Sequence, residues 1–214
     1  MSVADMSMIL YNRSDVNGCH EGDVESMSRW EPNARGRLEQ AALDLYQERG
    51  FEQTTVAEIA ERAGLTERTF FRYFADKREV LFGSQDMLRT LCVSTIEDAP
   101  ASAMPLDAVT AALEATIPMF QERSALIRQR QAVIAANPEL QEREMLKRAA
   151  LTSAMADALR RRGVTDLAAI LAAEVGSIAF KIAFDRWASE PNAQDLSQLI
   201  RASLDQLKGI VAGT

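Results

Sequence analysis

The chain has 214 residues, of which 47% are hydrophobic and 26% charged, enough for one large or two small domains with a sizeable core. Lys and Arg total 24 against 31 Asp and Glu, so the formal net charge of −7 excludes a generally basic protein that coats nucleic acid. Two cysteines make neither a disulfide framework nor a zinc site, and no apolar run approaches the roughly 18 residues that span a bilayer. We therefore expect a soluble cytoplasmic protein with no membrane partner.

Residues 1–31 differ from the rest of the chain. They have no sustained periodicity and contain two basic residues against six acids, which predicts a disordered leader. Met27 opens a second plausible start, so a mis-assigned translation start competes with a functional tail, and we favour the former. The expected organisation is a leader over 1–31, a first folded domain over 32–82, and a second over 83–214.

From Pro32 onward the apolar residues recur with helical spacing. A first amphipathic helix, built on Leu38 and the apolar positions that follow it, can end at Gly50. The capping-box pattern from Thr55 to Glu58 predicts the start of a second helix, which ends at Gly64. Thr66 then caps a short third helix that runs to about residue 74.

The remainder predicts six further helices, separated by prolines and a glycine. Their expected ranges are 76–98, 105–120, 123–136, 138–163, 166–189 and 192–212. The first of them begins at a second capping box, from Asp76 to Glu79. No stretch shows sustained alternation of β-branched residues, so we expect an all-α chain of about nine helices.

The second and third helices have the spacing of a helix-turn-helix, two helices joined by a short turn that contains a glycine, here Gly64. Phe70 and Phe74 lie at i, i+4 and would pack on the core. Arg68 and Arg72 lie about 160° and 200° around the helix from Phe70, and therefore point away from the core. Thr69, Phe71 and Tyr73 flank the two arginines, and Thr66–Arg78 carries four basic and two acidic residues. This surface suits the DNA major groove, although each arginine alone would also fit an ordinary solvated face.

The stretch Gly50–Lys77 closely resembles the DNA-binding signature of TetR-family transcriptional regulators, and the resemblance covers about residues 34–82. It implies phosphate contacts from Thr55 and Lys77, and a DNA backbone contact from Tyr73. It further implies that residues after the cap residue Thr66 face the DNA groove, and that the basic residues at the start of the first helix lie near the DNA backbone. The predicted DNA-contacting residues are Arg35, Arg37, Thr55, Thr66, Glu67, Arg68, Thr69, Phe71, Arg72, Tyr73 and Lys77.

Glu67 departs from a simple basic reading surface, because it places an acid close to the groove. Two interpretations stay open. The carboxylate can accept a hydrogen bond from a cytosine amine, or it can favour the positive end of the helix dipole.

The last two expected helices carry small and apolar residues on one face, which allows close packing of helices. This face can pack inside one chain, but the TetR resemblance implies a four-helix interface between two chains. A homodimer would also place two reading helices on the two half-sites of a palindromic operator. The predicted interface residues are Ala172, Gly176, Ala179, Ala183, Leu196, Leu199, Ile200, Ser203 and Leu207.

The middle helices supply apolar side chains that can enclose a small-molecule effector. Arg123 and Arg130 share a partly apolar face with Ile127, and either arginine could hold an anionic head group, although a solvated edge is the plainer interpretation for both. The stretch 128–143 also resembles the acyl-CoA-responsive branch of the family, which implies an acyl-CoA-like effector. The predicted ligand-binding residues are Met87, Leu91, Leu113, Ile117, Phe120, Ile127, Arg130, Met155, Phe180 and Phe184.

The composition argues against an enzyme. The one histidine, His20, lies in a polar stretch, so the rest of the sequence cannot form a Ser-His-Asp triad or a two-histidine metal site. The sequence also contains no phosphate-binding glycine motif. We expect no catalytic residues, cofactor or metal. The sequence predicts a TetR-like regulator, a repressor that binds double-stranded DNA as a dimer and is released by an apolar or amphipathic effector. The alternative is an all-α ligand-binding or interaction dimer without sequence-specific DNA binding.

Overall fold

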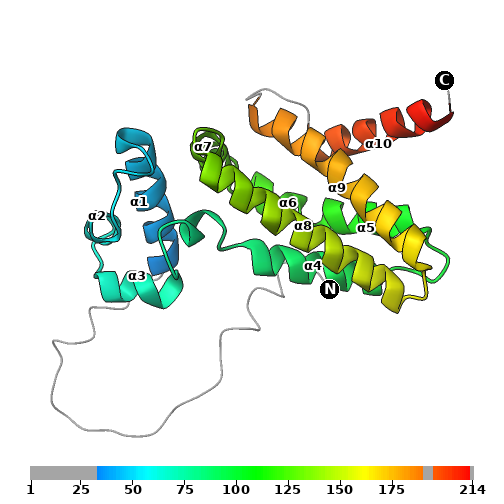
Figure 1. The fold of residues 1–214 in the computed structure, drawn as a ribbon, viewed down its shortest axis with the longest axis horizontal. Helices are drawn as coiled ribbons and strands as arrows, with labels where there is room; N and C mark the ends of the chain where they lie inside the picture. The colour runs from blue at the N-terminus through cyan, green and yellow to red at the C-terminus, as the bar shows by residue number, and fades with distance from the viewer. Residues whose placement is uncertain (1–32, 190–194, 213–214) are drawn as a thin grey trace, which may run out of the picture. The chain divides into compact units, whose positions relative to one another are not determined.

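The computed structural model describes residues 33–189 and 195–212, and all regular secondary structure within these ranges is helical (Figure 1). The expected leader lies outside the described residues. The chain order is α1 (Ala34–Arg49), α2 (Val56–Arg62), α3 (Glu67–Tyr73), the 3₁₀ helix η3 (Glu79–Leu81), α4 (Gln85–Glu97), α5 (Pro105–Ala115), α6 (Ile117–Gln121), α7 (Ser124–Ala135), α8 (Pro138–Arg161), α9 (Asp166–Ser189) and α10 (Leu196–Ala212). The prediction of an all-α chain is confirmed.

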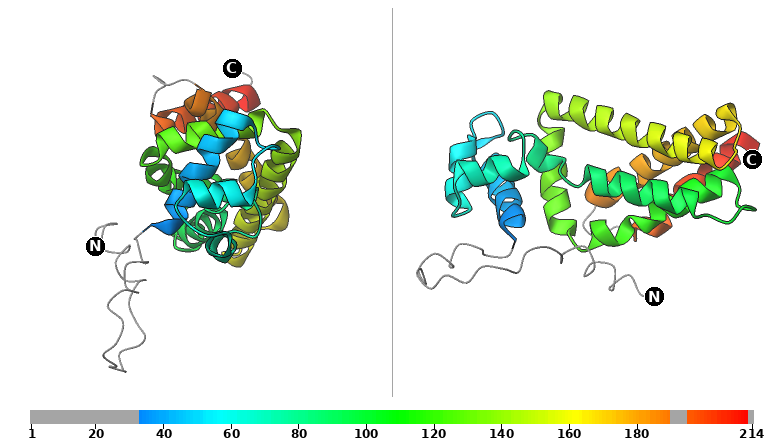
Figure 2. Two further views of the ribbon diagram at one scale, coloured as in Figure 1. Left: turned by 90° about the vertical axis from the view of Figure 1, so that its left-hand side faces the viewer. Right: turned by 90° about the horizontal axis from the view of Figure 1, so that it is seen from below.

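The helices α1, α2 and α3 pack together, and the segment after α3 leads from them into the C-terminal helices (Figure 2). Gly50 and Gly64 take positive φ angles of 86° and 66°, which let the chain turn sharply after α1 and α2. Thr55 and Thr66 cap the next helices as predicted, and Asn33 caps α1 through its side chain. The first three helices were therefore predicted correctly from their caps and turns.

The expected continuous helix over 76–98 is wrong in its first part. Asp76 accepts hydrogen bonds from the backbone N–H groups of Arg78 and Glu79, but the turn that it starts is only the 3₁₀ helix η3. At the end of η3 and just after it, arginine side chains from other helices donate hydrogen bonds to backbone carbonyls. Arg130 donates to the Leu81 carbonyl, and Arg35 donates to the Gly83 carbonyl. Helical structure resumes in α4 at Gln85.

The expected helix over 105–120 is two helices, α5 and α6, which brings the number of α-helices in the described ranges to ten. Thr116 separates them, and its hydroxyl donates to the Leu113 carbonyl over 2.6 Å. Pro118 lies in the first turn of α6, where the absence of its N–H is tolerated.

The long helix α9 lies among the C-terminal helices and packs against α5, α8 and α10. Two apolar clusters meet along it: one is shared with α4, α5 and α8, and the other with α6, α7 and α10. By length and composition α9 could cross a membrane, with a mean hydropathy of 1.8, so the prediction that no apolar stretch is long enough is wrong. The core helix of a soluble bundle meets the same criterion, so this single helix is weak evidence for a membrane span.

The small-residue face of α9 packs inside the chain, so its assignment to a dimer interface is wrong. A side chain at Gly176 would collide with Val109 of α5, and Ala172, Ala179 and Ala183 are also buried. Small residues allow close approach of any helix, and here the partner is α5. The assignment of Leu196, Leu199 and Ile200 is wrong for the same reason, because they are buried against α9. Ser203 and Leu207 remain partly exposed on α10.

Candidate functional site

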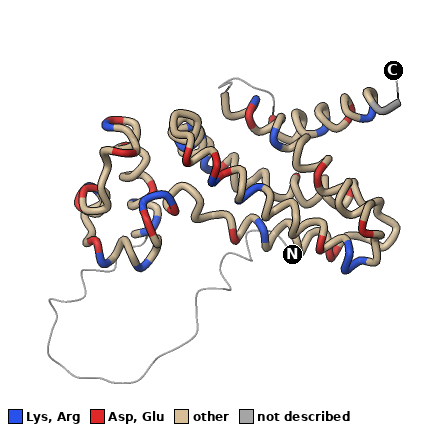
Figure 3. The backbone as a smooth tube through the Cα atoms, viewed as in Figure 1, with Lys and Arg blue, Asp and Glu red and all other residues tan. Residues whose placement is uncertain are grey.

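The third helix carries exposed charged residues, whose positions along the backbone are coloured in Figure 3. Phe70 and Phe74 are buried, and their rings lie 5.5 Å apart between centroids. On the other side Arg68 and Arg72 are exposed, and Phe71 is 55% exposed. The buried pair thus anchors α3 and fixes which residues face outward, as the sequence predicted.

The two outward arginines differ in their contacts. The guanidinium of Arg72 lies 5.0 Å from the centre of the Tyr73 ring and donates to the Tyr73 hydroxyl over 3.3 Å. Arg68 has no hydrogen bond, ion pair or ring contact with any residue that the structure describes. Its five N–H donors are therefore available to a partner outside the chain.

Threonines at the N-termini of α2 and α3 fix the start of each helix. The Thr55 hydroxyl and the Glu58 carboxylate form a complete capping box, and Glu58 also pairs with Arg49 over 2.7 Å. Hydrogen bonds from the Thr55 backbone and hydroxyl hold the pKa of Glu58 below its ordinary value. The Thr66 hydroxyl accepts a hydrogen bond from the Thr69 backbone N–H. The hydroxyls of Thr66 and Thr69 also form a hydrogen bond with each other over 3.1 Å. Glu67 is exposed in the first turn of α3.

Lys77 has a structural role that differs from the predicted phosphate contact. Its ammonium donates to the carbonyls of Phe51, Glu52 and Thr54 over 2.9, 3.1 and 3.0 Å. An ammonium has three donors, so all three are in use in this structure. Lys77 ties the segment after α3 to the turn before α2, and the Tyr46 hydroxyl supports it by donating to the Lys77 carbonyl.

The basic start of α1 also contacts protein. Arg35 pairs with Glu39 over 3.1 Å, donates to the Gly83 carbonyl and lies over the Phe74 ring. Arg37 is half-buried, and one of its guanidinium nitrogens lies close to Gly64. Arg35 therefore joins α1 to the start of α4, a role that the sequence did not predict.

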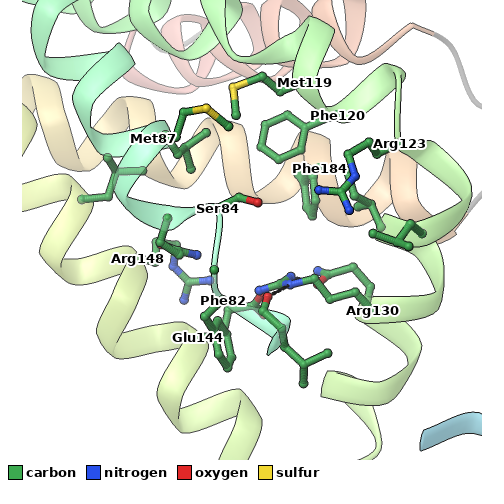
Figure 4. Close-up of a pocket in the computed structure, with 18 of the residues that line it drawn as sticks. Phe82, Ser84, Met87, Met119, Phe120, Arg123, Arg130, Glu144, Arg148 and Phe184 are labelled. Carbon is green, nitrogen blue, oxygen red and sulfur yellow. Dashed lines mark hydrogen bonds and ion pairs between the residues drawn. The ribbon is translucent and has the colours of Figure 1, made fainter. Parts of the chain in front are cut away.

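A cavity of about 290 Å³ lies beside η3 and is lined by residues of α1 and α4–α9 (Figure 4). This volume is at the lower end of the usual range for ligand sites. Of the predicted ligand-binding residues, the cavity brings together Met87, Leu113, Phe120, Ile127, Arg130, Phe180 and Phe184. Leu91, Ile117 and Met155 do not line it, and Met155 is fully buried in the core shared with α4 and α5.

Arg130 was predicted as a candidate to hold an anionic head group, but in the structure its guanidinium contacts other parts of the protein. It donates to the Leu81 carbonyl, pairs with Glu144 over 2.9 Å and lies over the Phe82 ring. Its side chain is only 17% exposed. Burial lowers the pKa of Arg130, although the ion pair with Glu144 opposes the shift.

On the polar side of the cavity the sequence analysis considered Arg123 but missed Glu39. Glu39 of α1 lines it and is 6% exposed, and it forms ion pairs with both Arg35 and Arg123. Arg123 precedes α7, so this triad joins the first helix to the C-terminal helices. A glutamate within the apolar face of an amphipathic helix was the available signal, since buried carboxylates require a cationic partner.

Comparisons with known proteins agree with this geometry. The family model for bacterial regulatory proteins of the TetR family matches residues 39–83, and the model for the MftR C-terminal domain matches residues 103–212. The HTH-type transcriptional regulator TcmR of Streptomyces glaucescens is 37% identical over 83 residues, which are 39% of this chain and 37% of TcmR.

MftR of Mycobacterium tuberculosis, a transcriptional regulator named for mycofactocin biosynthesis, is 29% identical over 125 residues, which are 58% of this chain and 63% of MftR. The chain thus aligns with less than two thirds of either relative. Among solved structures, SmeT of Stenotrophomonas maltophilia in complex with triclosan superimposes with a TM-score of 0.57 at 21% identity, over 81% of this chain and 88% of SmeT. At that identity the likeness shows the fold alone.

Proposed function

The chain belongs to the TetR family of transcriptional regulators, with a C-terminal domain of the MftR type, and from this premise we propose a one-component repressor that binds a palindromic operator as a dimer. Family members are regulators rather than enzymes, which confirms that the chain is not an enzyme. We further propose a cytoplasmic location and a division of labour between residues 32–82, which bind DNA, and residues 83–214, which bind an effector and a second subunit.

The observation that carries the DNA-binding proposal is the outward face of α3. Arg68 has no partner in the described part of the chain, and Arg72, Thr69 and Phe71 lie beside it around a helix anchored by buried phenylalanines. Arginine can bind guanine through two hydrogen bonds, and threonine or phenylalanine can touch the thymine methyl group. We place Thr55 and Tyr73 against the DNA backbone.

The dimer proposal now uses the opposite face of α9. Its exposed apolar residues follow helical spacing on the side away from Gly176: Leu167, Ile170, Leu171, Ile178 and Ile182. Ile178 and Ile182 are 51% and 55% exposed, whereas a soluble monomer rarely leaves such a continuous apolar surface uncovered. A second copy of this chain is the occupant that the two half-sites of an operator require.

Two variants test the proposed interface. Ile178→Glu would bury two unpaired carboxylates in a symmetric interface, so it should raise the dimer dissociation constant at least tenfold. Met145→Glu, at an exposed methionine of α8, is the matched control. Gly176→Leu should lower the melting temperature through its collision with α5 and leave the dimer intact. A dimer that survives Ile178→Glu in analytical ultracentrifugation would contradict this interface.

The effector proposal rests on the cavity, whose wall is mostly apolar and includes residues of α1 as well as of the C-terminal helices. A ligand that contacts Glu39 or Arg123 would act directly on the ion pair that joins α1 to the N-terminus of α7. Binding releases DNA only if the ligand prefers the arrangement that does not bind DNA. We propose an apolar or amphipathic effector, with an acyl-CoA-like molecule as one candidate.

A gel shift of the full chain on DNA from upstream of its own gene tests the regulatory function. The proposal predicts a shifted complex that an excess of unlabelled upstream DNA competes away, whereas the same excess of random DNA does not. Loss of competition in the Arg68→Ala variant would connect the binding to α3. If wild-type chain binds amphiphiles but shifts no DNA, the chain is a ligand-binding dimer without sequence-specific DNA binding.

A further inference from the structure

Arg148 of α8 is a half-buried arginine on the wall of the cavity. Its carbonyl accepts from the Thr152 hydroxyl, but its guanidinium, like that of Arg68, has no hydrogen bond, ion pair or ring contact with any residue that the structure describes. Every other described arginine or lysine has such a partner. A half-buried guanidinium without a partner is unfavourable, because it has lost part of its hydration without gaining an acceptor.

Each of the other cations on the cavity wall already has an ion-pair partner. Arg123 pairs with Glu39, Arg130 pairs with Glu144, and Lys181 pairs with Asp185 over 2.6 Å. The remaining carboxylate of the wall, Glu122, is exposed at the end of α6. The positive charge of Arg148 is therefore the one that the described side chains of the cavity leave without a counter-ion.

Ser84 supplies a second donor. It stands at the N-cap position of α4, yet its side chain makes no capping hydrogen bond. Ser84 and Arg148 both line the cavity, and in Figure 4 the Ser84 hydroxyl points toward the middle of the view, with Arg148 to the left of Ser84. Around these two groups the wall is apolar and aromatic, with Met87, Phe120 and Phe184 nearby.

We infer that Arg148, assisted by Ser84, binds the oxyanion head group of an amphipathic effector whose apolar tail lies against the aromatic side chains of the cavity. Carboxylate and phosphate share the required chemistry, since either accepts two parallel hydrogen bonds from a guanidinium. A cavity of about 290 Å³ suits one tail and a small head group. This inference rests on the proposed effector site and specifies what that site recognises.

Isothermal titration calorimetry on the full chain can test the inference with three series of probes of matched length: alkanoates from octanoate to hexadecanoate, alkyl phosphates, and alkan-1-ols. The variants are Arg148→Gln, Arg148→Lys and, as a control of equal charge change on the same helix, Arg161→Gln. Arg161 is exposed, pairs with Glu97 and does not line the cavity. Melting temperatures are measured in parallel.

Wild-type chain should bind at least one anionic series about tenfold or more tighter than the alcohol of the same length. Arg148→Gln should remove this preference for the anion and leave alcohol binding and the melting temperature unchanged. Arg148→Lys should retain part of the preference. Arg161→Gln should behave as wild type. The tighter of the two anionic series identifies the head group.

The inference is overturned if Arg148→Gln still prefers the anionic probes, or if the wild-type chain binds the alcohols without preferring the anions. In either case the proposed effector site itself would stand. A large drop in the melting temperature of Arg148→Gln would also overturn the inference, because it would make Arg148 structural. If no probe of any series binds the wild-type chain, both the inference and the proposed effector site fail.

Discussion

The outward face of α3 and the wall of the cavity each contain one arginine whose side chain has no hydrogen bond, ion pair or ring contact with any residue that the structure describes. The other basic residues nearby do have such contacts. On α3, Arg68 is exposed near Lys77, which is fully used by three carbonyls. In the cavity, Arg148 is half-buried near Arg130, which is tied to Glu144 and to the Leu81 carbonyl. The contrast separates basic residues that hold the fold from basic residues that remain available for ligands.

The surroundings of the two available arginines differ, and this predicts different kinds of binding. Water surrounds Arg68, so each of its interactions is weak and screened by salt, and affinity must come from many contacts with DNA. Arg148 is half-buried on a cavity wall that is mostly apolar, where the lower dielectric strengthens a single ion pair. Substitutions at the four positions can test both parts of the comparison.

The largest effect on stability is expected at Arg130. Arg130→Ala removes an ion pair and a carbonyl hydrogen bond from a side chain that is 17% exposed, and leaves Glu144 without its cation. We expect the free energy of unfolding to fall by about 3 kcal/mol. Denaturant unfolding, with Arg201→Ala as the control for an exposed pair, checks this. Equal losses in the two variants would remove the distinction between structural and available arginines.

Lys77→Ala should have the next largest effect. It deletes three hydrogen bonds to the carbonyls that precede α2 and should destabilise the chain by about 2 kcal/mol. Operator affinity should then fall together with the melting temperature, and the salt dependence of binding should keep its slope. A stable Lys77→Ala variant whose salt slope falls by about one would restore Lys77 as a phosphate contact.

Arg68→Ala should have the smallest effect on the fold and a specific effect on DNA. The melting temperature should stay within a degree of wild type, because no described contact is lost. Operator binding should weaken by about 1.5 kcal/mol, close to tenfold, with relaxed preference at one base pair. Arg72→Ala serves as the comparison, since Arg72 already contacts Tyr73. Fluorescence anisotropy on single-base operator variants measures the loss, and a uniform loss across sequences would contradict base reading.

How far the sequence predicts the fold depends on whether the determinants are local. The caps at Thr55 and Thr66, the glycine turns and the inward pair Phe70 and Phe74 are set within a few residues, and all were predicted. The break between η3 and α4 was not, because Arg35 and Arg130 reach its carbonyls from helices far away in the sequence.

The candidate sites follow the same rule. Periodicity showed that α9 has a small-residue face, but it did not show that α5 covers that face. Apolar spacing found most of the cavity wall, yet chose Arg130 as the anion ligand rather than Arg148. Which arginine is available depends on the positions of Glu144 and the Leu81 carbonyl, and these are known only from the structure.

Random-site selection with the full chain tests the central claim most directly, namely that α3 reads DNA. The account predicts enrichment of a palindrome whose half-sites are centred about one helical turn apart. In a parallel selection, Arg68→Ala should lose the preference at one symmetric pair of positions and keep the rest. Recovery of no enriched sequence by the folded wild-type chain, or of the same sequence with undiminished preference by Arg68→Ala, would contradict the account.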